Sequence, residues 1–90
     1  MDTHILVVDD EAAIADLVEV YLKNEGYIVH KFYDAAGALD CVAREHLDLA
    51  ILDVMLPDMD GLDVLRRLRE IGSTPIVIFS AQDEEASRIV

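Results

Sequence analysis

One short apolar run ends at three acids: Ile5-Leu-Val-Val-Asp-Asp-Glu11. A second apolar run of similar length ends at a single acid: Leu49-Ala-Ile-Leu-Asp53. Apolar runs of this length with polar residues only at the end are typical of buried parallel strands. The carboxyl ends of neighbouring parallel strands open at the same edge of a sheet, which is where α/β proteins bind ligands. We therefore expect Asp9, Asp10 and Asp53 to converge in one small cleft.

Three carboxylates in one cleft need a proton, a cation or a chemical reason to be there. Two unit charges about 4 Å apart repel by roughly 4 kcal/mol at an effective dielectric constant of about 20. Mg²⁺ suits an all-oxygen site because it takes one or two carboxylates, keeps several waters and leaves room for phosphate oxygens. The pattern therefore favours a magnesium site at this edge of the sheet.

The composition predicts a single domain and excludes several classes of function. The chain has 90 residues, 53% of them apolar, which is enough for one domain with a core. A net charge of −12 opposes binding of DNA or RNA through this segment. No run approaches the roughly 20 apolar residues that cross a bilayer, and the start lacks a signal-peptide pattern. The single Cys41 fits a reducing compartment, so we expect a cytoplasmic protein with no membrane partner.

Apolar blocks alternate with helical patterns along the chain, which is typical of an α/β domain with a parallel sheet. Strands are expected at residues 5–8, 27–32, 49–52 and 76–79, and helices at residues 11–25, 35–45 and 62–71. Gly26 is expected to end the first helix in a left-handed conformation, and Asp34 to cap the second. The side chains expected to face inward from the three helices are Ile14, Leu17, Val18, Tyr21, Leu22, Leu39, Val42, Ala43, Leu62, Leu65 and Leu68.

The last residues predict an incomplete sheet. Residues 83–90 have the pattern of the start of a fourth helix, and the fourth strand would then leave an apolar edge without a neighbour. The sheet would be cut short after its fourth strand and the start of its fourth helix. A shortened chain, an incomplete sequence, or an oligomer such as a homodimer or a domain swap would explain this ending.

Three motifs resemble the receiver domain of two-component response regulators over all 90 residues. They are Val7-Val-Asp-Asp-Glu11, Ile51-Leu-Asp-Val-Met-Leu-Pro-Asp-Met-Asp-Gly61 and Pro75-Ile-Val-Ile-Phe-Ser-Ala81. The stretch Ala15-Asp-Leu-Val-Glu-Val-Tyr-Leu-Lys-Asn-Glu-Gly-Tyr27 further resembles the OmpR/PhoB-like branch, whose members carry a winged-helix DNA-binding output domain, and within it the vancomycin-resistance regulators. The resemblance implies a doubly wound, flavodoxin-like fold with strand order 2-1-3-4-5. Residues 1–90 would be the receiver domain, incomplete at its carboxyl end, with the output domain absent.

The resemblance also implies roles for five residues. Asp53 would accept a phosphoryl group from a sensor histidine kinase, and Ser80 would hydrogen-bond that group and move on activation. Mg²⁺ would be held by Asp10, by Asp9 through water, by Asp53 and by the backbone carbonyl of Met55. The chain would then be a phosphoacceptor switch rather than an enzyme, and would act on DNA only through the missing output domain.

Two other functions stay open from the sequence alone. A pseudo-receiver would be an interaction module without phosphotransfer; the acids and Ser80 argue against it, whereas the absence of the family's lysine-bearing fifth strand argues for it. A magnesium-dependent aspartyl-phosphate phosphatase would also use acids at strand ends. Such enzymes typically place a second Asp two residues after the nucleophile, where this chain has Met55. Because Met55 cannot orient a water by hydrogen bonding, it also predicts slow loss of the phosphoryl group.

Overall fold

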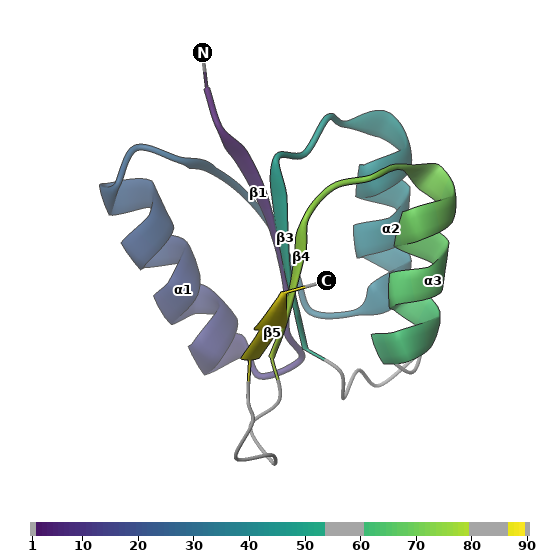
Figure 1. Ribbon diagram of the computed structural model, residues 1–90. Helices are drawn as coiled ribbons and strands as arrows, with labels where there is room; N and C mark the ends of the chain where they lie inside the picture. The colour runs from purple at the N-terminus through teal and green to yellow at the C-terminus, as the bar shows by residue number, and fades with distance from the viewer. Residues whose placement is uncertain (1, 54–60, 80–86, 90) are drawn as a thin grey trace.

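A sheet with strand order β2-β1-β3-β4-β5 forms the centre of the computed structural model, which describes residues 2–53, 61–79 and 87–89 (Figure 1). The strands are β1 (His4–Val8), β2 (Ile28–Phe32), β3 (Leu49–Asp53), β4 (Ile76–Phe79) and β5 (Ser87–Ile89). Strands β1 to β4 are parallel to one another. One face of the sheet is covered by α1 (Ala12–Asn24), and the other by α2 (Ala35–Arg44) and α3 (Gly61–Ile71).

The doubly wound parallel arrangement predicted from the sequence is confirmed, with one correction at the end of the chain. Residues 87–89 form β5, which pairs antiparallel with β4, so the helix predicted over residues 83–90 is wrong there. Within the described residues the sheet therefore does not stop at β4. An isolated helix start of eight residues is marginal, whereas a strand supplies hydrogen-bond partners to the open edge of β4.

Strand β1 is buried on both faces of the sheet. Its side chains alternate between the faces, as strand geometry requires. Leu6 and Val8 belong to the core beneath α2 and α3, whereas Ile5 and Val7 belong to the core beneath α1. All four are at most 3% exposed. Burial on both sides explains why the run is continuously apolar rather than alternating.

Two predicted helix ends are confirmed. Gly26 has a φ of 90°, which is the left-handed conformation expected after α1. Asp34 Oδ1 accepts a hydrogen bond of 3.0 Å from the backbone N–H of Gly37, which makes Asp34 the N-cap of α2. Among the described residues, no helix has the length and apolar character needed to span a membrane.

The inward face of α1 differs from the predicted one. Ala15 is fully buried, and Val18 and Leu22 pack against the core. Leu17 and Tyr21, predicted to lie in the same stripe, are 58% and 67% exposed. The apolar positions of α1 cover an arc that is too wide for one helix to bury against one sheet face. The helix comes closest to the sheet at the small side chain of Ala15. The spacing of apolar residues along α1 does not indicate which side of the helix makes this closest approach.

The packing residues of α2 and α3 were predicted only in part. Leu39, Val42 and Leu65 pack against the core as expected. Ala43 and Leu62, also expected inside, are exposed. Leu68, also expected inside, is buried, as are Ala35, Ala38 and Cys41 of α2 and Val64 of α3.

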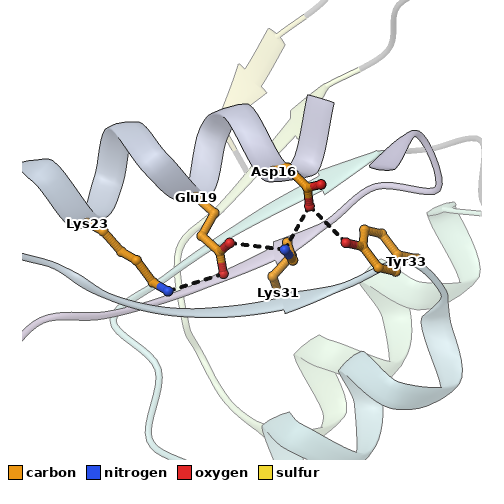
Figure 2. A network of polar contacts seen from close by, with 5 residues as sticks. All are labelled: Asp16, Glu19, Lys23, Lys31 and Tyr33. Atoms are coloured by element: carbon orange, nitrogen blue, oxygen red, sulfur yellow. Dashed lines mark hydrogen bonds and ion pairs between the residues drawn. The ribbon is translucent and has the colours of Figure 1, made fainter. Parts of the chain in front are cut away.

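A network of polar contacts joins α1 to the edge strand β2 (Figure 2). Lys31 Nζ lies 2.7 Å from Asp16 Oδ1 and 3.0 Å from Glu19 Oε1. The Tyr33 hydroxyl donates to the same Asp16 oxygen at 2.8 Å, and Lys23 Nζ lies 3.5 Å from Glu19. The network therefore links α1 to β2 by polar contacts at the solvent-exposed border of the interface between α1 and the sheet.

The ionised carboxylates of Asp16 and Glu19 stabilise the folded state above the ordinary pKa of a carboxyl group. Hydrogen bonds from Lys31 lower the pKa values of Asp16 and Glu19 below their ordinary range, and those to Asp16 and Glu19 raise the pKa of Lys31. The unfolded carboxyls bind protons more readily than the folded ones. Their contribution to stability is therefore complete above the ordinary carboxyl pKa and is lost as pH falls through the lowered values.

We expect Lys31→Met to lower the urea midpoint of unfolding at pH 7 more than Lys23→Met does. Lys31 contacts both carboxylates, whereas Lys23 reaches only Glu19, at 3.5 Å. The difference between the two variants should shrink at pH 3, where the carboxyls begin to lose their charge. Equal midpoints at pH 7 would contradict a stabilising role for the network.

Truncation of β1 in the core should be far more damaging than truncation on the outer side of α1. We expect Leu6→Ala to lower the free energy of unfolding by about 2–5 kcal/mol, because Leu6 is fully buried. Leu17→Ala, at a position 58% exposed, should change it by no more than about 0.5 kcal/mol. Urea denaturation followed by circular dichroism measures both, and similar losses would show that the outer side of α1 is covered in solution.

Candidate functional site

The carboxyl ends of β1 and β3 bring together the three acids that the sequence singled out. The two strands pair in parallel with Val8 opposite Leu52, so Asp9 and Asp53 occupy corresponding positions of neighbouring strands. One carboxylate oxygen from each of Asp9, Asp10 and Asp53 lies within 4.8 Å of the others. The predicted convergence of these side chains is therefore confirmed.

The three acids differ in how far they are buried. Asp9 is 5% and Asp53 9% exposed, whereas Asp10 is exposed. The site is thus open on the Asp10 side and closed beneath the other two carboxylates. Two buried carboxylates beside a third acid lose much of their hydration, which strengthens their attraction for a cation.

Backbone contacts that the sequence did not reveal hold Asp9 in place. The N–H of Glu11 donates a hydrogen bond of 2.9 Å to Asp9 Oδ1, and the N–H of Asp9 donates one of 3.1 Å to the carbonyl of Phe32. The first contact orients the carboxylate, and the second fixes the end of β1 against β2. The first is a local contact of a kind that Asp side chains commonly make with the backbone two residues on, whereas only the pairing of β1 with β2 could have indicated the second.

The donor set fits a hard divalent cation. All three candidate ligands supply carboxylate oxygens, which Mg²⁺, Ca²⁺ and Mn²⁺ prefer. Oxygen ligands of one octahedral Mg²⁺ lie about 3–4 Å apart, so ligand atoms within 4.8 Å of one another need only small rotamer changes to bind one ion. This cluster can therefore hold a metal.

An apolar cavity of about 120 Å³ adjoins the acids between α1 and the sheet. Asp9 and Asp53 form its polar end. The remaining lining residues are Val7, Val8, Ile14, Ala15, Val18, Ile51 and Val77. The apolar walls keep the inner side of the carboxylate cluster in a low-dielectric environment, which strengthens its electrostatic interactions.

Two of the predicted site residues, Met55 and Ser80, lie outside the described residues. Their implied roles stay predictions. The roles of Asp9, Asp10 and Asp53 as ligands and phosphoacceptor are likewise not tested by their convergence alone.

Comparison with known proteins identifies the family. The profile of the response regulator receiver domain matches residues 5–90. The chain belongs to the response regulator receiver family. This receiver is 48% identical over 89 residues to the regulatory protein VanR of Enterococcus faecium, and 45% identical over 89 residues to VanRc of Enterococcus gallinarum. Each match covers 99% of this chain and 38% of the relative, so the chain spans well under half of the length of these proteins.

Solved receiver domains share the fold. A CheY-like response regulator receiver domain protein from Methanospirillum hungatei matches this receiver with a TM-score of 0.87 and 31% identity, over 89% of this chain and 65% of that one. The receiver domain of the Francisella response regulator 1452 matches with a TM-score of 0.85 and 30% identity, over 92% and 69% of the respective chains. The resemblance indicated by the motifs, including that to the vancomycin-resistance regulators, is confirmed.

Removing one charge from the acid cluster should stabilise the metal-free receiver. Charges up to 4.8 Å apart repel by about 1–3 kcal/mol, depending on the effective dielectric constant. We therefore expect Asp10→Asn to unfold at a higher temperature than the parent in a chelator at low ionic strength. Added divalent cation should raise the unfolding temperature of the parent and have much less effect on the variant.

Glu11→Gln is the matched control for Asp10→Asn, because it removes a neighbouring negative charge from outside the cluster of Asp9, Asp10 and Asp53. The control should keep most of the response to divalent cation. An Asp10→Asn variant that is less stable than the parent in chelator would show that repulsion does not dominate the cluster.

Proposed function

We propose that this receiver accepts a phosphoryl group on Asp53 from the phosphohistidine of a sensor histidine kinase. The observation that carries the proposal is the position of Asp53, 9% exposed at the end of β3 with Asp9 and Asp10 within reach of a shared cation. Membership of the receiver family supports the phosphoacceptor role. The chain then acts as a switch rather than as an enzyme that turns over a substrate.

In the transfer, a carboxylate oxygen of Asp53 forms a bond to phosphorus while the bond from phosphorus to the imidazole nitrogen of the kinase breaks. Asp9 and Asp10, together with Asp53 and the backbone carbonyl of Met55, would hold Mg²⁺. When bound, Mg²⁺ supplies the positive charge that offsets repulsion between the attacking carboxylate and the phosphoryl oxygens. The contribution of this chain is mainly positioning, as is usual for phosphoryl transfer, and pairing within the sheet fixes the Asp53 backbone.

Ser80 is the candidate that senses the phosphoryl group. It directly follows Phe79, which is the partner of Asp53 in the register of β3 and β4. A hydroxyl next to this position can donate a hydrogen bond to a phosphoryl oxygen, which is a local event able to shift a loop. Asp53 phosphorylation and Ser80 movement together make the proposed switch.

The output of the switch is transcriptional control through a DNA-binding domain outside this segment. Similarity to VanR and VanRc, of which the chain spans 38%, supports this placement. The net charge of −12 argues against contact of the segment itself with DNA. A kinase donor and a DNA target, both part of this proposal, support a cytoplasmic location for the receiver.

Intact mass spectrometry after incubation with acetyl phosphate and Mg²⁺ tests the phosphoacceptor. We expect one added phosphoryl group on the parent and none on Asp53→Asn. Asp9→Asn keeps the acceptor but loses a carboxylate of the cluster, so its adduct should form at least tenfold more slowly. An adduct on Asp53→Asn, or no adduct on the parent, would overturn the proposal.

A further inference from the structure

The amino-terminal edge of the sheet lies at the opposite end of the strands from the acids and gathers all three histidines of the chain. His4 Nδ1 and His30 Nε2 are 2.9 Å apart. The backbone N–H of His4 donates to Asp48 Oδ2 at 2.8 Å, and His46 Nε2 lies 3.2 Å from Asp48 Oδ1. The start of β1, the middle of β2 and the segment before β3 are thereby joined in one hydrogen-bonded chain.

The register explains why the two rings meet. Leu6 is the partner of His30 and His4 is the partner of Ile28, so His4 and His30 are diagonal neighbours on the same face of the sheet. Both are partly buried on the side covered by α2. The contact links residues 26 positions apart in the sequence and crosses from the central part of the sheet to its edge strand.

The rings meet edge to edge, as hydrogen-bonded imidazoles do. Their centroids are 5.2 Å apart and their planes are inclined by 21°. The distance between the ring centres is the sum of three lengths: the 2.9 Å between His4 Nδ1 and His30 Nε2, and the distance from each ring centre to its own nitrogen. The lengths can add up in this way only if both nitrogens lie on the line between the ring centres. Nitrogens that point straight at each other leave no room for a metal ion between them, and the geometry is that of an N–H···N hydrogen bond.

Such a pair can hold only one proton in the bridge. In the neutral pair, one ring donates its N–H and the other accepts. A first added proton goes to an outer nitrogen and makes the bridge a charge-assisted hydrogen bond, which is stronger. A second added proton would leave two N–H groups facing each other at 2.9 Å, so the contact has to open.

We propose that His4 and His30 form a proton-sharing clasp which joins the start of β1 to the middle of β2 and opens when both imidazoles are protonated. The unfolded chain protonates both histidines freely in mild acid, whereas the closed clasp accepts one proton fewer. Stability is therefore lost as pH falls through the lower part of the histidine range, where the unfolded chain takes up the second proton that the closed clasp cannot hold. A difference of one bound proton changes the ratio of folded to unfolded chains by up to about tenfold per pH unit.

The charged groups near this end of the sheet are mostly acids. The titratable and charged groups on α2 and on the segments that lead into β1, β2 and β3 are Asp2, Glu25, Tyr27, Asp40, Cys41, Arg44, Glu45, His46 and Asp48. Acids predominate, and the cation among them, Arg44, is paired with Asp40 at 2.7 Å. None of these groups relieves the collision of two N–H donors that face each other at 2.9 Å.

Nuclear magnetic resonance of the histidine rings of the full chain tests the clasp without any substitution. We expect His4 and His30 to titrate together in two separate steps, because coupled groups release their protons as a pair. His46, which contacts Asp48 and no other imidazole among the described residues, should titrate in one step. Independent single-step curves for His4 and His30 would overturn the proposal.

Thermal unfolding between pH 7.5 and pH 5 gives the second readout. His30→Gln keeps an amide that can donate to or accept from His4 Nδ1 but has no titrating nitrogen. The parent should lose about 4–8 °C more than this variant on acidification, which corresponds to one hydrogen bond. His46→Gln is the control and should keep the parent's acid slope. A His30→Gln variant with the parent's full acid slope would contradict the clasp.

Discussion

Parallel pairing of β1 with β3 sets Asp9 and Asp53 side by side, and the rest of the structure serves to keep that pairing in place. Three acids within 4.8 Å of one another oppose folding through their repulsion. The opposing term is burial: β1 is covered on both faces, and Leu52 of β3 is fully buried. The apolar residues before the acids hold the backbone at the strand ends, so the three side chains stay together despite this repulsion.

The two ends of β1 carry different chemistry on one rigid segment. Roughly 17 Å of extended chain separates the histidine end from the acid end, since each strand residue advances by about 3.3 Å. Acidic oxygens at one end suit a hard cation, whereas at the other end the imidazole of His4 lies 2.9 Å from that of His30. Helix α1 and the Lys31 network hold the edge strand β2 against this segment along its length.

Most of the fold followed from the sequence, because continuous apolar runs and helix-capping residues act locally. The strand order needed the family resemblance, and the resemblance was confirmed by the receiver profile. The sequence failed where packing depends on distant residues: Leu17 and Tyr21 have helical apolar spacing yet face outward. Residues 87–89 form a strand because they pair with the edge of β4. The secondary-structure propensities of these residues carry no information about that distant partner. At the site, the acids were recognisable from their positions at strand ends, whereas the contact of the Asp9 N–H with the Phe32 carbonyl depends on the pairing of β1 with β2.

The outward apolar side of α1 ties the solubility of this chain to ionic strength. Leu17, Val20 and Tyr21 are each more than half exposed, on a molecule whose net charge is −12. At low salt, mutual repulsion keeps two such molecules from bringing these side chains into contact. At physiological ionic strength the screening length falls to about 8 Å, shorter than the diameter of the domain, and the repulsion acts only at close range. The tendency of this receiver to self-associate therefore depends on two opposing interactions, attraction between the exposed apolar side chains of α1 and the salt-screened repulsion between acidic surfaces.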